Sequence, residues 1–126
     1  MRTKDKIEEF SDAVARTAKS MPTQEVDGPT LNMLHWVLGI AGEAGELIDP
    51  IKKYVFYNKE LDIGNVQEEL GDILYYTIAL INELGLDPEY VMSDVIYKLQ
   101  LRYPKGYSDE HAQLRLDKEL QDNAGC

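Results

Sequence analysis

The sequence contains very little cysteine and no long hydrophobic run. Of the 126 residues only Cys126, the last, is a cysteine. One thiol cannot form an internal disulfide or a cysteine-based zinc site. No run approaches the roughly 18 apolar residues of a membrane-spanning helix, and the N-terminal MRTKDKIEEF has no apolar signal region. These absences predict a cytoplasmic, intracellular protein without a membrane segment.

Basic residues are also scarce. The chain has 13 Lys and Arg against 23 Asp and Glu, a formal net charge of −10. Nucleic-acid-binding proteins usually present a basic stripe, because phosphate neutralisation dominates their affinity. The sequence therefore predicts no nucleic-acid partner. An acidic protein can still bind a phosphate ligand if a metal cation bridges the two.

Several common site motifs are missing. The two histidines, His35 and His111, have Asn32 and Ser108 three residues before them, so the Glu-x-x-His pairs of di-iron bundles are absent. HExxH, calcium-loop, Walker-type and GxGxxG phosphate-loop patterns are absent as well. Zincin, EF-hand and P-loop chemistry are thereby excluded.

Helical periodicity extends over almost the whole chain, and no stretch shows sustained strict alternation. Predicted helices cover residues 4–20, about 30–49 with a continuation past a break or kink at Pro50, 65–84 and 88–102, with a short polar helix within 108–121. These predict an all-α fold, a bundle of four or five helices. Residues 1–126 form a single domain, with its core at about 31–107 and a mobile or intersubunit tail at 108–126.

Three polar residues are the predicted N-caps of these helices. Thr30 precedes the second helix, and Asn65 with Glu68 resembles a capping box before the third. Asp87 followed by Pro88 is the expected start of the fourth.

Four acidic residues form the pattern that points to chemistry. Glu43 and Glu46 are three residues apart, as are Glu69 and Asp72, so each pair shares a helix face. The 22 residues between Glu46 and Glu69 allow one helix to end and an antiparallel one to begin. Four converging carboxylates would repel one another unless cations lie between them, and Mg²⁺ is usually shared with substrate phosphates.

Glycines beside these carboxylates strengthen the hypothesis. Gly39, Gly42 and Gly45 repeat at every third position, and Gly71 lies between Glu69 and Asp72. Each helical glycine costs about 1 kcal/mol relative to alanine. Glycine lets a second backbone or a ligand approach closely, and broken local rules are expected at functional sites. The alternative is that the carboxylates are ordinary solvated charges on helix faces.

A cationic pair lies near the end of the fourth predicted helix, in KLQLRYPKGY. Lys98 and Arg102 are four residues apart and share a face. They either stabilise the helix C-terminus through its dipole or bind phosphate oxygens. Lys52 and Lys53 are a weaker example of the same pattern.

The segments GEAGELID, EELGDILYY and KLQLRYPKGY, in this order, resemble the MazG-like branch of the all-α nucleoside-triphosphate pyrophosphohydrolases. The resemblance covers about residues 31–107. It implies helical subunits assembled as homodimers or homotetramers (dimers of dimers). It also implies hydrolysis of (d)NTP to (d)NMP and pyrophosphate with Mg²⁺ or Mn²⁺, more than one ion per site.

The same resemblance assigns roles by position. The implied catalytic metal ligands are Glu43, Glu46, Glu69 and Asp72, and Glu46 also orients or deprotonates the attacking water. The implied phosphate contacts are Lys53, Lys98 and Arg102. Weaker substrate contacts are His35 and Trp36, which either line a base pocket or belong to the core, together with Asp94 and Tyr103.

Two departures from the family pattern stand out. Many relatives have an asparagine two or three residues before the lysine that matches Lys98, where this chain has Val95 and Ile96. Asp94 is the candidate replacement. Pro50 interrupts a helix that usually runs smoothly into the lysine pair that contains Lys53.

The resulting functional prediction is a small NTP pyrophosphohydrolase with a slight preference for purine deoxynucleotides such as dGTP. One alternative is a related enzyme acting on dUTP or a phosphoribosyl nucleotide. The other is a non-catalytic helical oligomer that binds metal or nucleotide.

Overall fold

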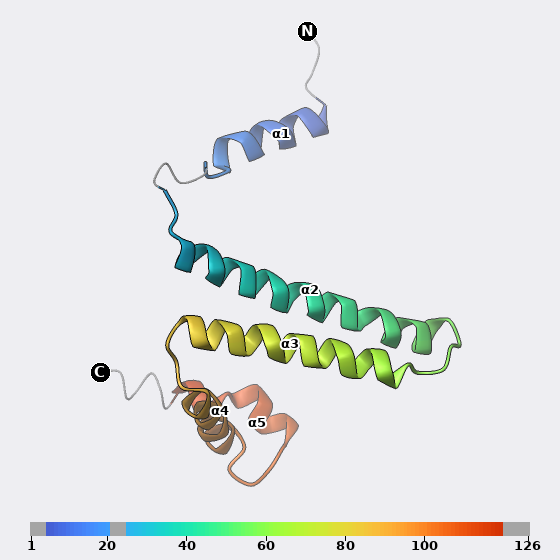
Figure 1. The fold of residues 1–126 in the computed structure, drawn as a ribbon, viewed down its shortest axis with the longest axis vertical. Coiled ribbons are helices and arrows are strands. Elements are labelled where there is room, and N and C mark those ends of the chain that lie inside the picture. The colour runs from blue at the N-terminus through green and yellow to red at the C-terminus, as the bar shows by residue number, and fades with distance from the viewer. Residues whose placement is uncertain (1–4, 21–24, 120–126) are drawn as a thin grey trace.

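A computed structural model, which describes residues 5–20 and 25–119, confirms the all-helical fold (Figure 1). Its helices are α1 (Lys6–Thr17), α2 (Gly28–Phe56), α3 (Ile63–Glu83), α4 (Pro88–Arg102) and α5 (Asp109–Leu114). None of the described helices is both long and apolar enough to span a membrane. The predicted helix order is therefore correct, but several predicted helix boundaries differ from the observed ones.

α2 and α3 form an antiparallel hairpin that positions the candidate site (Figure 1). The two helices pack along their length, and Ile81 of α3 is buried. At Gly39 of α2 the ring of Tyr76 lies where a side chain would otherwise be. The absence of a Cβ there allows α2 and α3 to approach each other closely.

Two of the three predicted N-caps are wrong. α2 begins after Asp27, whose carboxylate accepts the backbone N–H of Thr30 at 2.9 Å. α3 begins after Asp62, whose carboxylate accepts the N–H of Asn65 at 3.0 Å. An aspartate three residues upstream satisfies the free N–H of the first turn and so starts each helix earlier. The third predicted cap, Asp87 of α4, is confirmed.

Pro50 does not end the second helix. α2 continues through it to Phe56, and Pro50 is buried. Because proline has no N–H, the carbonyl of Glu46, four residues earlier, loses its helical donor. The helix therefore reaches Lys53 without interruption.

The remaining helices pack less extensively. α1 projects from the start of α2, and α4 with α5 lies beside the end of α3 (Figure 1). The expected short polar helix is α5, followed by a helical turn at residues 116–119. Parts of three predicted segments lie outside the described residues, namely 1–4, 21–24 and 120–126 with Cys126.

A candidate metal centre on α2 and α3

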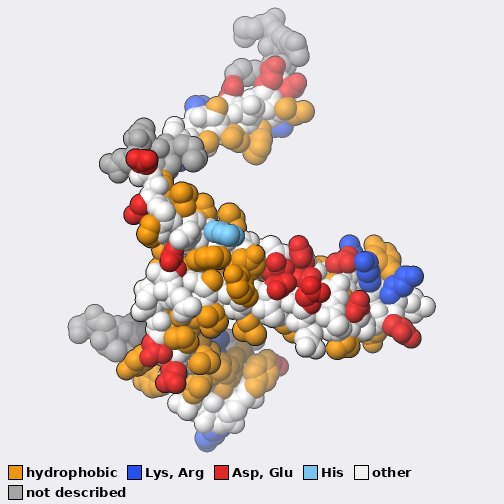
Figure 2. Space-filling model, in the orientation of Figure 1, with side chains coloured by type: hydrophobic (Ala, Val, Ile, Leu, Met, Phe, Trp, Pro, Cys, Tyr) orange, Lys and Arg blue, Asp and Glu red, His pale blue; other side chains and the backbone are white. Residues whose placement is uncertain are grey.

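Three of the four predicted carboxylates converge between α2 and α3. Glu43, Glu69 and Asp72 each offer one oxygen, and these oxygens lie within 4.8 Å of one another. All three side chains are half-buried. The α2–α3 turn brings the pair on α3 against Glu43 because the helices are antiparallel. Figure 2 shows acidic side chains gathered over this part of the hairpin.

The electrostatics of this cluster favour a cation. The neighbouring Glu69 carboxyl group is the main cause of a raised pKa for Glu43, and burial and the charge of Asp72 raise it further. Glu43 Oε2 and Glu69 Oε2 are buried with no hydrogen-bond partner among the described residues. Uncompensated buried carboxylate oxygens are costly. Hard divalent cations with oxygen ligands supply the missing partner, so the cluster fits Mg²⁺ or Mn²⁺.

Glu46 lies at the edge of this cluster. It is exposed, and it is not among the three carboxylates whose oxygens converge. A side-chain hydrogen bond with Glu46 nevertheless acts to lower the pKa of Glu43, so the two carboxyl groups are neighbours. An exposed carboxylate beside the cluster is accessible to solvent water.

The predicted phosphate contacts lie on two elements. Lys53 follows Glu46 by seven residues, two turns along the same face of α2, and its ammonium lies 2.7 Å from Asp49. Asp49 is the main cause of a raised pKa for Lys53. Lys98 and Arg102 are on α4, outside the hairpin that carries the carboxylates (Figure 1).

Arg102 already has an anionic partner. Its Nε donates to Asp117 Oδ1 at 2.8 Å and its Nη2 to Asp117 Oδ2 at 3.0 Å. Tyr103 caps the end of α4 beside this pair, with the guanidinium carbon of Arg102 at 6.0 Å from its ring centre. Asp94, also on α4, is exposed. No motif marks out Asp117, which is one of several acidic residues in the polar tail.

The two weaker predicted contacts on α2 belong to an aromatic group. His35 and Trp36 stack with ring centres 4.6 Å apart, and Tyr76 of α3 lies 6.3 Å from Trp36. Tyr75 meets Tyr76 edge to face at 5.1 Å. Tyr75 and Tyr76 were not among the predicted contacts, although they end the EELGDILYY segment that carries the second carboxylate pair.

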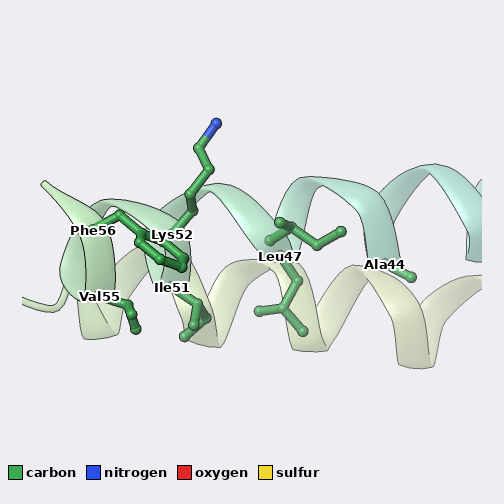
Figure 3. Close-up of a pocket in the computed structure, with 7 residues that line it drawn as sticks. Ala44, Leu47, Ile51, Lys52, Val55 and Phe56 are labelled. Atoms are coloured by element: carbon green, nitrogen blue, oxygen red, sulfur yellow. The ribbon is translucent and has the colours of Figure 1, made fainter.

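A separate apolar hollow of about 490 Å³ lies along the C-terminal half of α2 (Figure 3). Leu47, Ile51, Val55 and Phe56 line it, and the ammonium of Lys52 points away from it. With no other ionisable group in its lining, this hollow has no means of acid–base or metal chemistry.

Comparison with known proteins identifies the family. Residues 31–107 match the MazG nucleotide pyrophosphohydrolase domain. A curated relative, the Gene 37 protein of Mycobacterium phage L5, is 34% identical over 74 residues, which cover 55% of this chain and 64% of the relative. The chain thus matches less than two thirds of that relative's length. No solved structure matches. Because the matched domain covers more than half of the chain, the protein belongs to the MazG nucleotide pyrophosphohydrolase family.

Proposed function

We propose that this protein hydrolyses nucleoside triphosphates to monophosphate and pyrophosphate with Mg²⁺ or Mn²⁺ as cofactor. The observation that carries the proposal is the convergence of Glu43, Glu69 and Asp72, two of which have a buried oxygen without a partner among the described residues. Membership of the MazG family supplies the reaction class. Deoxynucleotides, purine ones such as dGTP in particular, are the proposed substrates.

The proposed roles follow from burial and position. Glu43, Glu69 and Asp72 hold the cofactor, and more than one ion is expected per site. The bound cation supplies Lewis-acid charge that neutralises phosphate oxygens and lowers the pKa of water. Exposed Glu46, next to Glu43, orients the attacking water and accepts its proton.

The proposed hydrolysis needs only water and the nucleotide as reactants. The water oxygen forms a bond to a phosphorus of the triphosphate, and the phosphoanhydride bond to the leaving group breaks. Lys53, on the same face of α2 as Glu46, contacts the phosphates. Lys98 and Arg102 provide further positive charge, which is most effective where negative charge develops in the transition state. Arg102 must share its donors with Asp117 or exchange that partner for phosphate.

The position of α4 supports a proposal about assembly. Its cations lie outside the hairpin that holds the carboxylates, and most large apolar side chains of the described residues are exposed. We therefore propose that the working form is a homodimer or homotetramer in which Lys98 and Arg102 reach the carboxylates of a neighbouring subunit.

The test is pyrophosphate release from the eight common NTPs and dNTPs with Mg²⁺ or Mn²⁺, with and without EDTA. We expect metal-dependent release with monophosphate as co-product. Glu69→Gln and Glu46→Gln should each reduce turnover by at least about 100-fold while the far-ultraviolet circular dichroism stays helical. Near-normal turnover in both variants would eliminate the assigned site.

A matched control is Glu60→Gln, which neutralises an exposed glutamate in the α2–α3 turn and should leave turnover unchanged. If the folded, metal-loaded wild type hydrolyses none of the eight nucleotides, the substrate is a phosphoribosyl or other modified nucleotide, or the protein is non-catalytic. Assays with those substrates then decide between the two alternatives.

A further inference from the structure

A second hollow lies along the C-terminal half of α3, beside Trp36 of α2. Its volume of about 630 Å³ is within the range of roughly 300–1,000 Å³ that is typical of small-molecule sites. Trp36 of α2 and Tyr75, Asn82 and Glu83 of α3 line it, with three apolar side chains. It thus combines aromatic and apolar walls with two polar groups, unlike the hollow along the C-terminal half of α2.

Helix geometry connects this hollow to the carboxylate cluster. Trp36 precedes Glu43 by seven residues, two turns or about 10 Å along α2. Glu83 follows Asp72 by eleven residues, three turns or about 16 Å along α3. Both spacings return to the same helix face. Trp36 and Glu83, at one edge of the hollow, therefore lie on the same side of the hairpin as the cluster, two to three helical turns away from it.

The walls of the hollow suit a planar ring. Trp36 stacks on His35 and lies near Tyr76, which meets Tyr75 edge to face, so the aromatic rings hold one another in place. Nucleobases stack on aromatic side chains with a gain that is largely independent of base identity. The aromatic group alone would therefore bind a base without selecting one.

Glu83 supplies the selectivity. Its Oε1 is buried with no hydrogen-bond partner among the described residues, in a hollow that also contains the amide of Asn82. A carboxylate only accepts hydrogen bonds and takes two parallel donors best. Guanine presents two adjacent donors, N1–H and the 2-amino group, on its Watson–Crick edge. Adenine, cytosine and thymine each have only one donor group on that edge.

We infer that this hollow is a guanine pocket in which Glu83 accepts hydrogen bonds from the base between Trp36 and Tyr75. The inference rests on the proposed function, whose phosphate end is the carboxylate cluster. Asn82, at the rim, donates its amide to the guanine O6. A polar pocket of this kind rejects bases that leave its buried groups unpaired.

Trp36 is the single tryptophan, so its fluorescence reports on the hollow directly. The experiment titrates the protein with dGMP and with dAMP. Wild type is expected to bind dGMP more tightly, and Glu83→Gln to lose roughly 10-fold or more of that preference with little change toward dAMP. Glu60→Gln, the same change in the α2–α3 turn, should retain it.

Two results overturn the inference. One is equal affinity of the wild type for the two monophosphates, or an unchanged preference in Glu83→Gln. The other is unaltered Trp36 fluorescence together with a changed oligomeric state of Glu83→Gln, which would mean that a second copy of the chain covers the hollow. Because monophosphate binding requires no turnover, guanine selectivity without any dNTP hydrolysis would refute the proposed function alone. Hydrolysis without a contribution from Glu83 would refute the guanine pocket alone.

Discussion

The guanidinium of Arg102 and the carboxylate of Asp117 form a bidentate ion pair that attaches the chain after α5 to the end of α4. The Asp117 side chain is fully buried, and Arg115 adds a more distant positive charge at 3.8 Å. Hydrogen bonds from Arg102 lower the pKa of Asp117 to about 2 from its ordinary value of 3.8. A buried ion pair of this kind fails if either partner is removed, since the other charge is then left uncompensated.

Acid should therefore weaken this attachment in a defined pH range. The folded-state pKa of Asp117 lies below its unfolded value, so its contribution to stability is complete above the unfolded value and is lost as the pH falls toward about 2. Asp117→Asn should lower the urea midpoint at neutral pH, and its deficit should shrink as the pH falls from about 5 to about 2. Urea unfolding over that pH series measures both effects. A constant deficit at every pH would contradict the assignment.

The carboxylate pairs and Arg102 illustrate how much of the site could be predicted from the sequence. The i, i+3 spacing within each carboxylate pair placed both members on one face, and three of the four do converge. Arg102 was expected to contact phosphate or stabilise the helix end, and a helix pattern contains no information on a carboxylate partner 15 residues away in a polar tail. Which anion Arg102 binds depends on tertiary packing, and the same holds for the Glu83 carboxylate in its hollow.

Among the helices, α2 combines features that local propensity disfavours. It spans 29 residues with Pro50 inside it and three glycines near the carboxylates. Its predicted continuation past Pro50 is confirmed, but the helix does not break there, and the Pro50 ring is buried. Its start was misplaced because Thr30 and Asp27 are both acceptable caps, and only the backbone geometry decides between them. The helix order could thus be predicted from the sequence, whereas the exact helix ends depend on packing and backbone geometry.

Gly39 is the glycine that the α2–α3 packing requires. A Cβ at Gly39 would overlap the ring of Tyr76, whereas one at Gly42 would meet no atom within 4 Å. Gly39→Ala should therefore lower the free energy of unfolding by about 1–3 kcal/mol. Gly42→Ala should raise it by about 0.5–1 kcal/mol through helix propensity. Urea unfolding at one fixed protein concentration compares them, and equal losses would mean that another molecule occupies the space at Gly42.

Replacement of Pro50, in the same helix, should stabilise the protein, in contrast to replacement of Gly39. Proline in a helix interior costs about 3 kcal/mol relative to alanine, chiefly through the missing hydrogen bond to the Glu46 carbonyl. Pro50→Ala should raise the thermal midpoint, with part of the gain offset by loss of the buried ring. Pro88→Ala is the matched control, because proline at the first turn of α4 breaks no helical hydrogen bond. A lower midpoint for Pro50→Ala would indicate that ring packing dominates.

At the scale of the whole molecule, the chain exposes more surface than a compact monomer of its mass. The chain exposes 10826 Å², against about 6,800 Å² expected for a folded monomer of 14.3 kDa. This excess of about 4,000 Å² per chain is larger than the roughly 1,000–2,500 Å² that an obligate homodimer interface buries on each partner. Ile48, Val55 and Phe56 of α2 are each at least 60% exposed. These surfaces become buried if subunits associate.

Size-exclusion chromatography with light scattering should accordingly give the mass of a dimer or tetramer. Ile48→Glu places a charge in the apolar hollow on α2, where the native side chain is 63% exposed, and should shift the mass downward. Gln113→Glu adds the same carboxylate at an exposed polar position of α5 and should not change the mass. A monomeric wild type would contradict the proposed assembly.

Mixing inactive subunits tests whether each site takes its cations from a neighbour. Glu69→Gln removes a carboxylate from the α2–α3 cluster, and Lys98→Gln removes a cation from α4. If Lys98 serves the partner's cluster, a mixed dimer has one intact site of two, because one subunit supplies sound carboxylates and the other a sound lysine. Random reassociation of equal amounts forms mixed dimers half of the time, so about a quarter of wild-type pyrophosphate release should return.

A mixture of Glu69→Gln with Glu43→Gln should stay inactive, because both changes lie in the same cluster. If the first mixture also stays inactive although mixed oligomers form, Lys98 does not reach the cluster of a neighbouring subunit.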